Sequence, residues 1–206
     1  MKSPLRYQIS EYDCGPTAML DAVSYLFERE EIPPEIIRNI MLYSLDCYSI
    51  DGISGERGTS CTAMMFLSNW LSGFGKIGQL PVSSRYLTGK DVFLGQNSYI
   101  NDALCRGGAA VVRLWLDEWH YTLLTGTCNG LVRMFDPYYQ KENDLPEGIQ
   151  IITDEPCRFN RIVPESVMNK NSCGTYSMGP EESREAVLLF NDRTRLTEDK
   201  TVEYMI

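Results

Sequence analysis

Four side chains, in the order Gln8, Cys14, His120 and Asp136, are of the types that nucleophilic acyl transfer requires. Cys14 stands in "RYQISEYDCGPTA", where it directly precedes a glycine, a proline and an apolar pattern of helical spacing. The first turn of a helix has unpaired N–H groups and the positive end of the helix dipole, and both lower the pKa of a thiol placed there. The position of Cys14 therefore makes it a candidate nucleophile.

The other three residues supply the remaining functions of such a site. His120, the only histidine, begins the run "HYTLLTG" and is the candidate general base and acid. Asp136 ends the next predicted strand, "LVRMFDP", across the predicted hairpin turn "GTCNG", so it can reach His120 from a neighbouring antiparallel strand and orient the imidazole. Gln8 can turn its amide toward an oxyanion, beside the backbone N–H of Cys14.

Each residue also has an ordinary structural explanation. A cysteine at a helix start is most often a small buried hydrophobe, a lone histidine in a strand is commonly structural, and Asp before Pro commonly begins a turn. Gln8 alone carries almost no information. The four residues together, in this order and spacing, favour an active site.

The motifs also resemble a known family. The order Gln, Cys, His, acid is that of papain-like cysteine peptidases, and "QISEYDCGPTA" followed by "HYTLL" and "FDP" is similar to the bacteriocin-processing peptidases, which cut leader peptides after a double glycine. The resemblance spans roughly residues 6–140. It implies Gln8 as the oxyanion-hole residue, Cys14 as the nucleophile, His120 as the base and Asp136 as the orienting carboxylate. Those peptidases usually precede a membrane exporter, and without one here we expect a stand-alone member.

Three alternatives remain open at this point. The same thioester could pass to an amine, which would make the protein an acyltransferase with unchanged catalytic residues. The fold could instead serve as a peptide-binding or regulatory module without turnover. Finally, the pattern of Cys, His and Asp could be a coincidence in a structural domain.

The residue patterns predict an α+β protein with a helical part at about 1–108 and an antiparallel sheet part at about 109–206. The family resemblance implies that residues 1–206 form a single papain-like domain. Helical spacing predicts helices from Cys14 to Phe27, over 33–45 and over 61–75, the last capped by Thr59 or Ser60, and a short helix ending at Gly107. Runs rich in branched and aromatic residues predict strands at 109–116, 120–126, 131–139, 149–153 and 185–191. The segment 159–183 is predicted to be mostly irregular.

Composition excludes several classes of function. The chain has 206 residues and a net charge of −9, which argues against nucleic acid or an anionic membrane as the partner. Seven scattered cysteines and one histidine argue against a zinc site, and no cofactor or metal is expected. The sequence contains neither an export signal nor a membrane span, so we expect reduced thiols and a cytoplasmic location. The candidate active site and the family resemblance imply a peptide or protein substrate.

Overall fold

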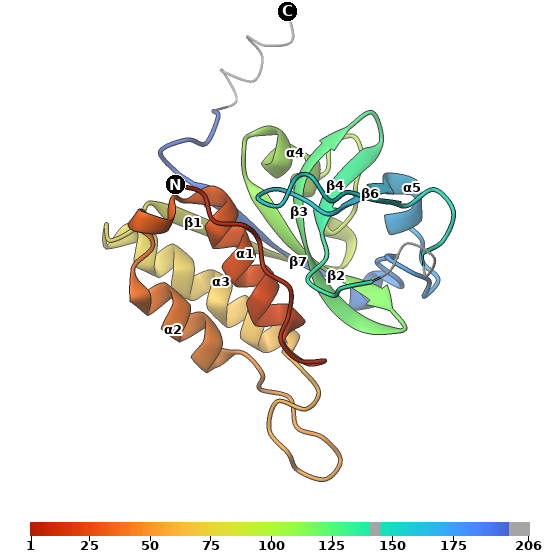
Figure 1. The fold of residues 1–206 in the computed structure, drawn as a ribbon, viewed down its shortest axis with the longest axis horizontal. Coiled ribbons are helices and arrows are strands. Elements are labelled where there is room, and N and C mark those ends of the chain that lie inside the picture. The colour runs from red at the N-terminus through yellow and green to blue at the C-terminus, as the bar shows by residue number, and fades with distance from the viewer. Residues whose placement is uncertain (141–144, 198–206) are drawn as a thin grey trace, which may run out of the picture.

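The computed structural model describes residues 1–140 and 145–197 as helices packed on an antiparallel sheet (Figure 1). The α-helices are α1 (Cys14–Leu26), α2 (Pro34–Tyr43), α3 (Cys61–Lys76), α4 (Tyr99–Cys105) and α5 (Glu165–Met168). The strands are β1 (Val82–Thr88), β2 (Ala109–Leu116), β3 (Glu118–Cys128), β4 (Leu131–Phe135), β5 (Gln150–Ile151), β6 (Arg161–Pro164) and β7 (Glu185–Asn191). The predicted α+β class is confirmed.

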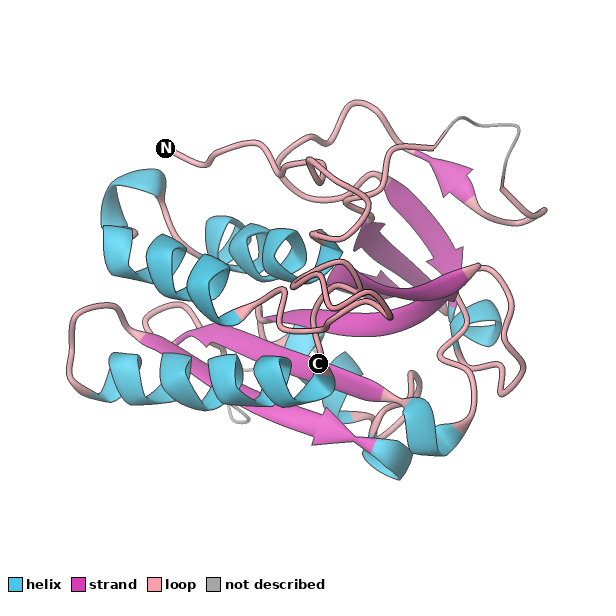
Figure 2. Cartoon of the chain, turned by 90° about the horizontal axis from the view of Figure 1, so that it is seen from below, coloured by secondary structure: helices cyan, strands magenta, loops and turns pink. Residues whose placement is uncertain are grey.

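The described strands form one seven-stranded sheet in the order β1-β7-β2-β3-β4-β6-β5, and every neighbouring pair is antiparallel. Strand β7 lies between β1 and β2, so the strand latest in sequence joins two that come much earlier. In Figure 2 the longer helices run alongside the strands of the sheet. The His120 end of β3 and the Asp136 end of β4 lie at the same end of the sheet, because antiparallel neighbours run in opposite directions.

The sheet buries apolar side chains on both faces. Helices α1, α2 and α3 cover one face, where they meet Val111 of β2 and Leu189 of β7. Helices α4 and α5 lie in a second cluster with Val112 and Leu188, the neighbouring residues on the same two strands. Side chains alternate between the faces of a strand, so a strand covered on both sides must be apolar at nearly every position. This explains the continuous apolar runs of β2 and β7.

The local signals for the first three helices act as predicted. Helix α1 carries Pro16 in its first turn, and α2 begins at Pro34, where a missing N–H costs nothing. Ser60 caps α3 by accepting a hydrogen bond from the backbone N–H of Ala63 at 3.1 Å. The helix ends at Lys76, just beyond Gly75, and a Cβ on Gly75 would lie 1.8 Å from the carbonyl oxygen of Val82. Only glycine fits where β1 passes this helix.

The predicted hairpin between β3 and β4 is confirmed. Its turn residues Asn129 and Gly130 have φ angles of 51° and 75°, which asparagine and glycine tolerate best. The turn fixes β4 beside β3 and so sets where Asp136 emerges.

Two strands and one short helix were not predicted from the sequence. Strand β1 lies within the part of the chain predicted to be helical, because its sequence "VSSRYLT" is too polar to stand out as a strand. It forms because it pairs with β7 along its whole length. Strand β6 and helix α5 lie within the segment predicted to be mostly irregular. Both are short, and β6 is held by pairing with β4 and β5 rather than by a local pattern.

Asp21 is a fully buried carboxyl group in α1. Its Oδ1 accepts the backbone N–H of Arg6 at 2.9 Å, but Oδ2 has no hydrogen-bond partner among the described residues. Burial raises the pKa of Asp21 to about 7, against smaller opposing effects of the Arg6 N–H and the Arg6 charge. The folded protein therefore holds this proton more tightly than the unfolded chain does, and stability falls as pH rises from about 4 to about 7.

We predict that Asp21→Asn removes this loss of stability. Between pH 5 and pH 8 the wild-type chain should lose about 2–3 kcal/mol of unfolding free energy relative to the variant, because asparagine does not ionise. Urea unfolding at both pH values measures the difference, with the exposed Asp51→Asn as the control. If Asp21→Asn and the wild type change in parallel between the two pH values, the buried carboxyl is not the cause.

Candidate active site

Helix α1 places Cys14 at its first residue, inside the protein but at the wall of a cavity. The side chain is 8% exposed, and the cavity of about 630 Å³ is lined by Cys14 together with His120. The N–H groups of a first helical turn have no acceptor within the helix. Asp13, at the N-cap, makes no side-chain hydrogen bond to these N–H groups. They therefore stay available as donors beside Cys14.

The Asp13 carboxylate instead shapes the loop between Gln8 and Cys14. It accepts the backbone N–H groups of Ile9 at 2.9 Å and Ser10 at 2.6 Å, together with the Ser10 hydroxyl at 2.6 Å. Burial alone would raise the pKa of Asp13, but these hydrogen bonds outweigh it and lower the pKa. Asp13 is thus a structural anchor that stays ionised.

Gly15 allows close approach of the loop that precedes α3. A Cβ on Gly15 would lie 2.6 Å from the Thr59 hydroxyl oxygen and 2.8 Å from its Cβ. Thr59 lines the same cavity as Cys14. The residue after Cys14 must therefore be glycine for the cavity wall to stand where it does.

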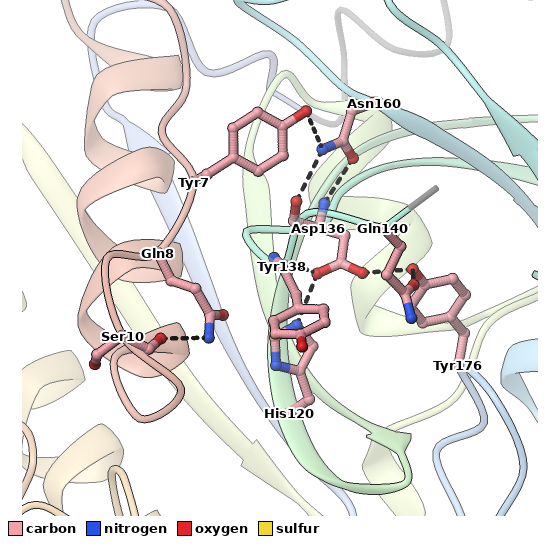
Figure 3. A network of polar contacts seen from close by, with 9 residues as sticks. All are labelled: Tyr7, Gln8, Ser10, His120, Asp136, Tyr138, Gln140, Asn160 and Tyr176. Carbon is pink, nitrogen blue, oxygen red and sulfur yellow. Dashed lines mark hydrogen bonds and ion pairs between the residues drawn. The ribbon is translucent and has the colours of Figure 1, made fainter. Parts of the chain in front are cut away.

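His120 and Asp136 form a buried pair. The Nε2 atom of His120 lies 2.7 Å from Oδ1 of Asp136, and Asp136 is fully buried (Figure 3). His120 lies near the start of β3, and Asp136 follows β4 directly, so the hairpin brings them together. Because Nε2 bonds to Asp136, Nδ1 is the ring nitrogen left for the thiol of Cys14.

The neighbours of His120 favour its charged form. Burial lowers the pKa of His120, but hydrogen bonds to Asp136 and Cys14, together with the negative charges of both groups, outweigh burial and raise the pKa to about 10. The structure therefore brings Cys14, His120 and Asp136 together in one connected arrangement. At neutral pH the imidazole is positively charged, and such a charge stabilises a neighbouring thiolate.

Several residues that sequence analysis did not predict brace Asp136. The Asn160 side chain accepts the Asp136 N–H and donates to the Asp136 carbonyl, both at 2.8 Å. The backbone N–H of Tyr138 donates to Oδ1 at 2.8 Å, and the hydroxyl of Tyr176 donates to Oδ2. Asn160 and Tyr176 lie in the C-terminal third, where no motif marked them. The contacts that bring them to Asp136 are entirely long-range.

Gln8 lies at the same site, with its amide engaged locally. Its backbone N–H donates to the carbonyl of Pro137 at 2.9 Å, which fixes Gln8 next to the Asp136 turn. Its side-chain Nε2 donates to the carbonyl of Ser10 at 2.7 Å (Figure 3). An amide nitrogen carries two protons, so one N–H remains for another acceptor.

A second cavity, of about 380 Å³, adjoins the first and is lined by Gln8 and His120. The two cavities share Glu11, Glu118 and His120, so the imidazole stands between them. Space on both sides of the imidazole is what an extended substrate would need. Acidic side chains in the second cavity are Glu11, Asp117 and Glu118, and among the described residues that line it His120 is the only basic one.

Comparisons with models of known protein families and with curated protein sequences find no match to this chain. The family resemblance of the motifs around Cys14 and His120 therefore stays a prediction. Within residues 1–140 and 145–197, no helix has both the length and the apolar character that crossing a membrane requires.

Proposed function

We propose that the protein is a cysteine peptidase that hydrolyses a peptide or related amide bond. One observation carries the proposal: Cys14, at the first turn of a helix, interacts with the only histidine, which is itself bonded to a buried carboxylate. These are the nucleophile, the base and the orienting group that covalent acyl transfer needs. The motifs support a papain-like enzyme similar to the bacteriocin-processing peptidases.

In the first half of the reaction the Cys14 sulfur attacks the substrate carbonyl carbon. A C–S bond forms, and the carbonyl π electrons move onto oxygen. The backbone N–H of Cys14 and the remaining Gln8 amide N–H are the donors available for this oxyanion. The intermediate then collapses, the C–N bond breaks, and the His120 imidazolium gives its proton to the departing amine. A thioester on Cys14 remains.

In the second half His120, now neutral, accepts a proton from water. The resulting hydroxide attacks the thioester carbonyl, the C–S bond breaks, and the sulfur leaves as a thiolate. The products are a carboxylic acid and the original thiolate–imidazolium pair. Asp136 holds the imidazole in one orientation through both halves.

The cellular setting is also part of the proposal. All seven cysteines are free thiols, as expected of a protein in a reducing compartment. We therefore propose a cytoplasmic enzyme with a peptide or protein substrate.

Cys61 offers a matched control for the reactivity of Cys14. It is the first residue of α3, as Cys14 is of α1, and both line the same cavity. Cys61 is the more exposed of the two. Cys14 alone interacts with His120, so a comparison of the two separates the imidazole from the helix dipole.

We predict that iodoacetamide at pH 6 alkylates Cys14 at least about tenfold faster than Cys61, because an ordinary thiol is almost fully protonated there. Peptide mapping by mass spectrometry measures both rates in one sample. Equal rates, or faster reaction of the exposed Cys61, would refute an activated thiol at Cys14.

A library of peptide aldehydes and vinyl sulfones then tests the peptidase reaction itself. The library should vary lysine and arginine through every position, because the second cavity is acidic. A covalent adduct on Cys14, with a preference among the peptides, supports the proposal. The absence of any adduct at Cys14, when iodoacetamide reacts there, would argue for an activated thiol with a different substrate.

A further inference from the structure

Tyr176 has an unusual position for a residue outside the motifs. It is fully buried, and its φ angle of 62° lies in the left-handed region, which large side chains rarely adopt. Two backbone hydrogen bonds hold it there: Tyr176 N–H to the Trp115 carbonyl at 2.7 Å, and Trp115 N–H to the Ser177 carbonyl at 2.8 Å. Strained backbone that surrounding contacts enforce is a reason to look for a function.

The hydroxyl of Tyr176 completes the hydrogen bonding of the Asp136 carboxylate. His120 and the Tyr138 N–H take Oδ1, and Tyr176 donates to Oδ2 (Figure 3). Burial raises the pKa of Tyr176, and the charge of Asp136 and the hydrogen bond to it raise it further, against a smaller lowering by Arg161. The hydroxyl is therefore a proton donor at every pH at which the enzyme would work.

Arg161 is a second buried charge beside this hydroxyl. Its side chain is almost fully buried, and only Nη1 has a hydrogen-bond acceptor, the Asn160 carbonyl at 2.9 Å. Among the described residues, Nε and Nη2 meet no acceptor with good hydrogen-bond geometry, although the guanidinium is close enough to the Tyr176 hydroxyl to lower its pKa. A buried guanidinium with free N–H groups attracts any carboxylate within reach, because a direct pair would relieve its desolvation. The Tyr176 hydroxyl donates to Asp136 and also interacts with Arg161, so the hydroxyl is a neighbour shared by the carboxylate and the guanidinium.

We propose that Tyr176 is a positioning residue whose hydroxyl keeps the Asp136 carboxylate on His120 and prevents it from pairing with Arg161. The inference rests on the proposed function, since it assigns the residue that keeps the His120–Asp136 pair intact. It gives the C-terminal third of the chain a direct part in the active site.

The single histidine makes the test direct. The ring C–H signals of His120 are the only imidazole signals in a proton NMR spectrum of the chain, so their pH titration reports His120 alone. The titratable and charged side chains around the pair include Cys14, Glu11, Asp117, Glu118, Arg113, Tyr121, Tyr138, Tyr176 and Arg161. Removal of the Tyr176 hydroxyl leaves the other side chains of this group chemically unchanged, so a change in the titration is due to that hydroxyl.

In Tyr176→Phe we expect the proton affinity of His120 to fall about tenfold, because Asp136 turns toward Arg161 and stabilises the imidazolium less. The control is Tyr86→Phe, which removes a similar 2.7 Å bond from a tyrosine to the carboxylate of Glu185. It should leave the His120 titration unchanged. A purely structural tyrosine would lower the melting temperature and leave the titration where it was.

A fall of threefold or more in Tyr176→Phe supports the proposal, and a smaller change or a rise overturns it. If that variant does not fold, Arg161→Met decides. Removal of the competing cation should raise the proton affinity of His120, and an unchanged or lower affinity would overturn the proposal. Iodoacetamide labelling of wild-type Cys14 is independent of these variants, so failure of the proposed function would be seen separately.

Discussion

Replacement of Cys14 by alanine should reduce hydrolysis of any cleaved library peptide by at least about 10⁴-fold, because Cys14 is the thiol that interacts with His120 and so the one placed to form the thioester. The substitution removes one sulfur atom from a side chain that is only 8% exposed, so the fold should survive. Initial rates with a fluorogenic form of the best peptide measure the effect, and circular dichroism checks the fold.

Cys61→Ala is the control for this experiment, since Cys61 lines the same cavity. It should retain nearly the full rate. Substantial turnover by Cys14→Ala would show that the reaction does not pass through this sulfur. If the alanine variant also kept the cellular role of the protein, binding rather than catalysis would be that role.

Asp136→Asn should lower kcat/KM by about 10²–10⁴-fold. The amide cannot hold the imidazolium as a carboxylate does. Burial lowers the pKa of His120. The hydrogen bond and the negative charge of Asp136 are among the leading effects that outweigh burial and raise this pKa to about 10. Because its pKa is raised, His120 stays protonated up to about pH 10. The proton that it would give to the leaving amine is lost only as the pH rises through that pKa. In the variant, the high-pH limb of the rate profile should therefore move to lower pH.

Asp21→Asn provides the matched comparison, because it also replaces a buried carboxyl group by an amide. Its pH–rate profile should coincide with that of the wild type. A profile for Asp136→Asn with a reduced rate but an unmoved high-pH limb would mean that Asp136 supports the fold rather than the charge on His120.

Sequence alone predicted the elements that depend on local signals. Apolar spacing after Cys14 marked α1, and the Asn129–Gly130 pair marked the hairpin that carries His120 toward Asp136. Both features act within a few residues of chain. We expected Cys14 to lie near His120 of the hairpin only because these residue types work together in catalysis. In the structure the two side chains interact.

Other parts of the site have no local signal. Asn160 reaches Asp136 across 24 residues, and Tyr176 reaches it across 40. Neither residue belongs to a motif, and their segments show no period. Strand β1 was missed for the same reason, since its partner β7 lies about a hundred residues away. Elements and contacts that depend on distant partners cannot be found by reading the chain in short windows.

The place of β7 between β1 and β2 has a consequence for synthesis of the protein. A ribosome makes the chain from its N-terminus, so β1 and β2 emerge long before the strand that joins them. Until Asn191 has left the exit tunnel, the sheet has a gap and both flanking strands have open edges. A nascent chain should therefore lack a complete sheet until β7 has emerged, and the proposed peptidase activity should appear only after that point.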